Sequence, residues 1–153
     1  MRRKIIAGNW KMNMLPNEAI KFIDEIAPLV KDTKNEVVLC VPYIDLFYSL
    51  LTAQNTNIKI GAQNMHQEEK GAYTGEVSAE MLKSIGVEYV IIGHSERRQY
   101  YNETDKSVNE KIKSALKNEL KPIVCVGETL EQKEEGKTEE IITKQVELAL
   151  EGL

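Results

Sequence analysis

The stretch Tyr89-Val90-Ile91-Ile92-Gly93-His94-Ser95-Glu96 shows how the whole chain is organised. It begins with a tyrosine and three β-branched apolar residues, passes through a glycine, and ends in residues suited to the start of a helix. We therefore predict a buried strand over residues 89–92. A helix should follow it at once, with Ser95 as the N-cap and Glu96 in the first turn, where the helix dipole favours a carboxylate.

Four further runs of the same kind occur along the chain, at residues 5–7, 37–41, 58–62 and 123–126. Most are continuous and rich in Val and Ile instead of alternating with polar residues. That pattern is typical of strands covered on both faces, as in a parallel sheet. Amphipathic stretches, with apolar residues three and four apart, follow every run. The sequence thus predicts an α/β fold of five consecutive βα units, forming a single domain over residues 1–153.

Five βα units fit two architectures. One is an open doubly wound sheet, which needs helices on both faces and a reversal in strand order; the other is part of a (β/α)8 barrel, with strand order 1-2-3-4-5. Both place the active site at the carboxyl ends of the strands. The polar residues that follow the first, third, fourth and fifth runs are Asn9, Lys11, Gln63, Asn64, His94, Ser95, Glu96 and Glu128.

Composition narrows the class of function. Apolar residues make up 42% and charged residues 29% of a chain with 24 acids and 20 bases. The sequence contains no basic block of the kind that predicts nucleic-acid binding. No apolar run approaches the roughly 18 residues of a membrane span, and the apolar stretch after the first basic residues is too short for a signal peptide. We expect a cytoplasmic protein without a metal or nucleotide motif. Cys40 and Cys125 lie in apolar runs, so we expect buried free thiols.

Two residues at the predicted rim suggest chemistry. His94 would lie where a helix begins, and both the positive helix end and burial disfavour imidazolium, so it would act as a neutral hydrogen-bond donor. Lys11 could face an anion in the mouth of a barrel. The alternatives are a structural histidine and a surface lysine lying over Trp10. The 63–77 segment is long for a βα connection, which suggests either a functional loop or a flexible insert.

Three segments together resemble the triosephosphate isomerase family. They are Ala7-Gly8-Asn9-Trp10-Lys11-Met12-Asn13, the pair Gly61-Ala62-Gln63-Asn64 and Gly71-Ala72-Tyr73-Thr74-Gly75-Glu76, and Ile92-Gly93-His94-Ser95-Glu96-Arg97-Arg98. Cys125-Val126-Gly127-Glu128 also fits. The resemblance covers the whole chain in order. It implies a partial (β/α)8 TIM barrel whose strands 6 to 8 have no counterpart here.

The resemblance also implies an activity and residue roles. The family interconverts glyceraldehyde 3-phosphate and dihydroxyacetone phosphate, in glycolysis and gluconeogenesis, through an enediol-type intermediate and without a cofactor. His94 would be the neutral electrophile, Lys11 would stabilise the substrate's negative charge, and Asn9 would help to bind substrate oxygens. Ser95 would position the catalytic base, and Glu96 would support Lys11.

By the same resemblance, the 63–77 loop would enter a second subunit and form a homodimer, with Thr74 and Asn13 as contacts. The family's catalytic glutamate, in a Glu-Pro-Val-Trp segment after strand 6, has no match here, because no proline follows a Glu and the only tryptophan is Trp10. We do not expect Glu128 to replace it. The chain alone should therefore be inactive, with open sheet edges that make it poorly stable or prone to associate. The alternatives are a non-catalytic half-barrel fragment and an autonomous doubly wound binding domain.

Overall fold

The five apolar runs form five parallel strands in the order β1-β2-β3-β4-β5, in a computed structural model that describes residues 3–153. The strands are β1 (Ile5–Asn9), β2 (Glu36–Val41), β3 (Ile58–Ala62), β4 (Tyr89–Ile92) and β5 (Lys121–Val124). The helices are α1 (Pro16–Val30), α2 (Leu46–Thr52), α3 (Ala79–Ser84), α4 (Ser95–Tyr101), α5 (Asp105–Lys117), α6 (Leu130–Glu134) and α7 (Thr138–Leu150), with a short 3-10 turn, η1 (Tyr43–Asp45), before α2.

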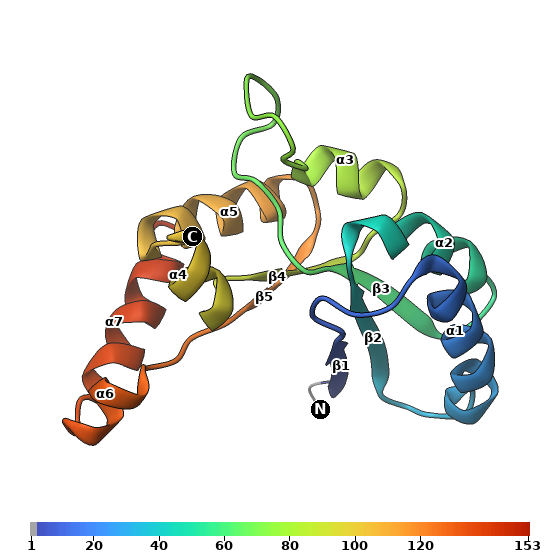
Figure 1. Ribbon diagram of the computed structural model, residues 1–153, viewed down its shortest axis with the longest axis horizontal. Coiled ribbons are helices and arrows are strands. Elements are labelled where there is room, and N and C mark those ends of the chain that lie inside the picture. Colours follow the sequence, from blue (N-terminus) through green and yellow to red (C-terminus); the bar gives the residue numbers. More distant parts are fainter. Residues whose placement is uncertain (1–2) are drawn as a thin grey trace.

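The strand order settles the architecture. The sheet contains no order reversal, so the doubly wound alternative is wrong and the partial barrel is confirmed. The sheet curls, and the helices lie along its outer side (Figure 1). A large core packs residues of the helices, such as Ile23 and Ile112, against the strands. A smaller buried cluster on the other face contains strand residues, with Val38 and Ile91 among them.

Local signals explain where the helices begin and end. Ser78 caps α3, because its hydroxyl accepts from the Met81 amide at 3.2 Å, and Gly86 leaves the helix with φ +100°. Thr104 caps α5 in the same way, accepting from the Ser107 amide. These capping bonds satisfy amides that have no partner inside the helix.

The fifth strand begins and ends two residues earlier than predicted, at Lys121 and Val124 instead of Ile123 and Val126. Pro122, which has no N–H to give to a ladder, is tolerated because β5 pairs only with β4 and so has a free side. Cys125 follows the strand and is half-buried, so the expectation of a buried thiol holds for Cys40 but is wrong for Cys125. Burial raises the pKa of the Cys40 thiol to about 12.

A hydrogen-bonded ion cluster lies at the amino-terminal end of the sheet. The Tyr89 hydroxyl, from β4, donates to Glu36 Oε1 of β2 at 2.6 Å, and Arg3 and Lys121 approach the same carboxylate at 3.4 and 3.7 Å. The tyrosine passes across β3 at Gly61, where an added Cβ would come within 3.1 Å of Tyr89 Cβ. Residues from distant strands thereby meet across the curl.

The two outer strands leave open edges in the part of the chain that the structure describes, because β1 pairs only with β2 and β5 only with β4. Ile5 and Ile6 of β1 are 48% and 59% exposed. Such edges present unpaired backbone groups beside apolar side chains. Within residues 3–153, no helix is both long enough and apolar enough to cross a membrane.

Candidate active site at the carboxyl ends of the strands

The loop after β1 turns sharply at Lys11. This residue has φ +56°, a left-handed conformation that is uncommon for a side chain other than glycine. Two side chains hold it there: the Lys11 amide donates to Asn9 Oδ1 at 2.9 Å, and Gln63 Nε2 donates to the Lys11 carbonyl at 2.8 Å. Asn13 donates to the Trp10 carbonyl at 2.7 Å and closes the same loop. The first and third loops are thereby joined.

His94 stands at the start of α4, directly after a glycine that no other residue can easily replace. Gly93 has φ +78°, and an added Cβ would lie 3.0 Å from Val108 Cγ2 and 3.2 Å from the Cys125 carbonyl oxygen. The chain can therefore turn from β4 into α4 within two residues, Gly93 and His94, and His94 lies at the rim.

The cap of α4 differs from the prediction. His94, and not Ser95, is the N-cap: its Nδ1 accepts from the Glu96 amide at 3.2 Å, while Ser95 is the exposed first helical residue. The His94 imidazole reaches the Glu96 amide from just outside the helix, whereas Ser95 already lies inside it. With Nδ1 as the acceptor of this bond, Nε2 is the ring nitrogen left for a contact inside the cavity.

The structure brings Lys11, His94 and Glu96 together. Lys11 Nζ lies 2.7 Å from Glu96 Oε1, and Glu96 Oε2 lies 3.5 Å from His94 Nδ1. The hydrogen bond from Lys11 lowers the pKa of Glu96, so this carboxylate stays ionised. Both partners are substantially exposed, so the pair adds little stability, and its effect is to direct the ammonium group.

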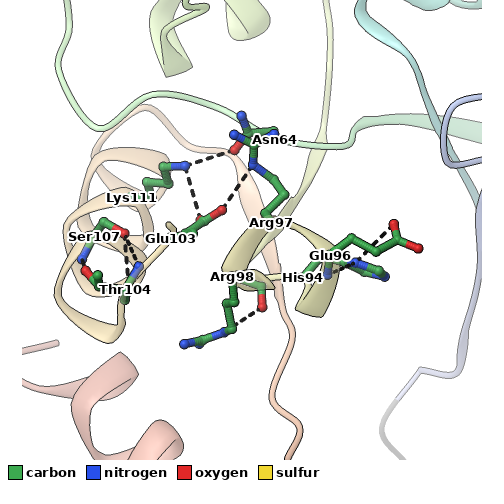
Figure 2. Close-up of polar contacts among 10 residues, drawn as sticks. Asn64, His94, Glu96, Arg97, Arg98, Glu103, Thr104, Ser107 and Lys111 are labelled. Atoms are coloured by element: carbon green, nitrogen blue, oxygen red, sulfur yellow. Dashed lines mark hydrogen bonds and ion pairs between the residues drawn. The ribbon is translucent and has the colours of Figure 1, made fainter. Parts of the chain in front are cut away.

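An open cavity of about 580 Å³ lies over these residues, a size that suits a small ligand. It is lined by Asn9, Lys11, Met12, Asn13, Pro42, Tyr43, Gln63, Asn64, His94, Glu96, Arg97, Tyr100 and Tyr101. Six of these residues, Met12, Pro42, Tyr43, Arg97, Tyr100 and Tyr101, were not predicted, although their positions just after β1 and β2 and within α4 are a usable signal. Figure 2 shows His94 and Glu96 leaving α4 on one side and Arg97 on another.

Ser95, Thr74 and Glu128 do not line this cavity. Thr74 is exposed on the loop between β3 and α3, which projects from the body of the molecule in Figure 1. The roots of that loop are joined by a bond from the His66 amide to the Val77 carbonyl at 2.8 Å. Glu128 accepts from Thr138 at 3.0 Å, and its pKa is lowered by its own amide and by this hydroxyl. It remains a partnered carboxylate.

No group of three or more histidine, cysteine, aspartate or glutamate side chains within residues 3–153 is arranged to hold a metal ion. The cavity presents polar groups of three kinds. They are an imidazole, an ammonium group paired with a carboxylate, and side-chain amides. Such a set can polarise a carbonyl oxygen and contact an anion.

Known proteins share the sequence and the fold of this chain. The family model described as triosephosphate isomerase matches residues 4–153. The triosephosphate isomerases of Caldanaerobacter subterraneus and Alkaliphilus oremlandii match this chain over all of its 153 residues, with 60% and 57% identity. The chain covers 62% of each of these relatives. The crystal structure of the Bartonella henselae enzyme matches with a TM-score of 0.93 and 40% identity, over 99% of this chain and 64% of that one. The chain thus spans about three-fifths of the length of these relatives, and it belongs to the triosephosphate isomerase family.

Proposed function

We propose that this chain supplies the electrophilic half of a triosephosphate isomerase site, which interconverts glyceraldehyde 3-phosphate and dihydroxyacetone phosphate. The observation that carries the proposal is the joint placement of Lys11, Glu96 and His94 over one cavity, at the ends of β1 and β4. Membership of the family supplies the reaction, and the geometry supports the roles. A role in glycolysis and gluconeogenesis would place the protein in the cytoplasm.

In this mechanism His94 donates Nε2–H to the substrate carbonyl oxygen. A neutral donor suits an enediolate, because it stabilises negative charge on oxygen without giving up a full proton. Lys11, paired with the Glu96 that also lies near His94, adds positive charge, and Asn9, at the end of β1, offers an amide to substrate oxygens. Ser95, next to His94 in sequence, would hold the base in its resting position.

The reaction also needs a base to move a proton between adjacent carbons. Two carboxylates near the cavity are engaged: Glu96 binds Lys11, and Glu103 binds Arg97 and Lys111. Glu128 binds Thr138 away from the cavity. Residues 1–153 alone are accordingly expected to lack measurable isomerase activity, since loss of the acid–base contribution lowers rates by about 10² to 10⁴.

The same proposal includes a homodimer formed through the 63–77 loop. The exposed Thr74 and the rigid loop roots support a projecting contact, and Asn13 lies on the first loop beside the cavity. A second subunit would then lie against the site.

Activity can be tested in a chimera of residues 1–153 followed by the C-terminal part of the Caldanaerobacter relative. We expect the chimera to interconvert the two triose phosphates and the 153-residue chain to show none of this activity. His94→Gln in the chimera should lower kcat by about 10²-fold or more. Equal rates with and without His94 would contradict the proposal, as would full activity of the 153-residue chain.

A further inference from the structure

A buried ion network lies between the root of the 63–77 loop and helices α4 and α5 (Figure 2). Lys111 Nζ donates to Glu103 Oε1 at 3.1 Å and to Asn64 Oδ1 at 2.9 Å. Arg97 Nε donates to Glu103 Oε2 at 3.1 Å. The side chains of Glu103 and Lys111 are only 3% and 8% exposed. Both carboxylate oxygens of Glu103 are thus occupied, and neither Glu103 nor Lys111 lines the cavity.

Stability alone does not explain such a network. Burial lowers the pKa of Lys111, with Glu103 opposing the shift. A buried ion pair can often be replaced by apolar side chains at no loss in stability, because removing charges from water is costly. Hydrogen bonds between these ions are directional, whereas apolar contacts are not. Each hydrogen bond fixes one particular partner, here Asn64 on one side and Arg97 on the other.

The two ends of the network both reach Lys11. Gln63, the neighbour of Asn64, donates to the Lys11 carbonyl at 2.8 Å. Glu96, the neighbour of Arg97, accepts from Lys11 Nζ at 2.7 Å. The polar contacts, together with the peptide links between residues 63 and 64 and between residues 96 and 97, therefore close a ring that holds the backbone of Lys11 from the third loop and its side chain from α4. Lys11 needs such support, because its left-handed backbone conformation is costly for a non-glycine residue.

We propose that Glu103 and Lys111 are positioning residues, which hold Lys11 and helix α4 in register with the root of the 63–77 loop. The roles of Lys11 and His94 in binding and catalysis rest on the proposed function. Through this network a displacement of the loop root at Asn64 is transmitted to α4, which carries His94. Contact between the 63–77 loop and a second subunit is thereby linked to the geometry of the site.

Two variants and a control test the network. Lys111→Met keeps the hydrocarbon stem but leaves Asn64 Oδ1 without its donor. Glu103→Gln keeps the shape and one acceptor oxygen, so it carries the test even if Lys111→Met does not fold. Lys106→Met is the matched control on the same helix, because this side chain is 87% exposed and forms only a 3.8 Å pair with Glu110.

Hydrogen exchange in the 153-residue chain requires no activity. We expect the His66 and Lys11 amides to exchange about tenfold faster or more in both network variants, with the Val38 amide of β2 changed less than twofold. Lys106→Met should leave all three amides unchanged. A selective loss at His66 and Lys11 supports the proposal. Equal acceleration at all three amides, which signals global destabilisation, or no acceleration at any of them, overturns it.

Kinetics in the chimera separate this proposal from the proposed function. We expect both variants to lower kcat by about tenfold or more, with KM changed less than threefold, because the displaced groups act on the transition state. If His94→Gln abolishes activity while the network variants keep their kcat, the network proposal is wrong and the function stands. If His94→Gln has no effect, the proposed function fails, and the exchange pattern alone decides the network.

Discussion

Tyr89→Phe isolates one hydrogen bond at the amino-terminal end of the curled sheet. The substitution removes the hydroxyl that donates to Glu36 Oε1 at 2.6 Å, while Arg3 and Lys121 remain near the carboxylate. It also keeps the ring beneath Lys121 Nζ, which lies 4.9 Å from the ring centroid. A hydrogen bond to a charged group contributes about 1.5 to 3 kcal/mol, so we expect a loss of about 2 kcal/mol in the free energy of unfolding. For a chain of this size that corresponds to a fall in Tm of about 4 to 8 °C.

The loss should depend on pH, because the hydrogen bond from Tyr89 is the main cause that lowers the pKa of Glu36 below its ordinary value of 4.5. A carboxyl group with a lowered pKa in the folded state stabilises the fold above its ordinary pKa, and this contribution is lost as the pH falls through the lower, folded-state pKa. The difference between the two proteins should therefore be largest at pH 7 and shrink by pH 3.

The measurement is thermal unfolding followed by circular dichroism at pH 7 and pH 3, at one protein concentration. Tyr48→Phe is the control, because Tyr48 is 47% exposed. A Tm difference of less than about 1 °C at pH 7 would refute the magnitude, and an equal difference at both pH values would refute the assignment to Glu36.

Three further predictions concern stability and association. Asp45 is fully buried, and neither of its carboxylate oxygens has a hydrogen-bond partner among residues 3–153. Burial raises its pKa, so Asp45→Asn should stabilise the fold at pH 8 by on the order of 1 kcal/mol, with a gain that disappears below pH 4. A urea titration that showed a loss at pH 8 would contradict this. Gly61→Ala should lower the free energy of unfolding by about 1 to 3 kcal/mol, because its Cβ would lie 2.8 Å from Cys40 Sγ, whereas Gly127→Ala, in open space, should be near neutral in the same titration. The 153-residue chain should self-associate through the exposed edge of β1, and Ile6→Lys should weaken this association about tenfold or more. Sedimentation equilibrium measures the association, and finding the unsubstituted chain to be monomeric would contradict the prediction.

Much of the fold could be predicted because the signals are local. Short apolar runs, most of them continuous and rich in Val and Ile, marked all five strands, and Ser78 and Thr104 are residue types that commonly cap helices. The cap of α4 was missed because the usual ranking favours serine, whereas a histidine side chain one residue earlier reaches the Glu96 amide. The shift of β5 was missed because a proline normally argues against a strand, and only its place at a sheet edge permits it.

Part of the lining of the cavity was predictable from the sequence, but its contacts were not. Lys11 and Glu96 are 85 residues apart in sequence, and no periodicity could pair them; the resemblance to a family suggested the pair, and the geometry supplies the distance. Tyr43 and Tyr101 were missed for a related reason, since the residues that line the cavity depend on how far the sheet curls. The network of Glu103 and Lys111 could not be predicted, because buried charges look like surface charges in a sequence.

The charges around the cavity bear on how strongly this part of the barrel can hold a phosphorylated ligand. Its lining includes the basic side chains Lys11 and Arg97. Lys11 lies 2.7 Å from Glu96, and Arg97 lies 3.1 Å from Glu103. An anion entering the cavity must compete with these carboxylates, so the net attraction is small. We therefore expect inorganic phosphate to bind the 153-residue chain only in the millimolar range or weaker by calorimetry. Glu96→Gln, which frees Lys11, should tighten that binding, and an unchanged affinity would mean that Lys11 does not face the bound anion.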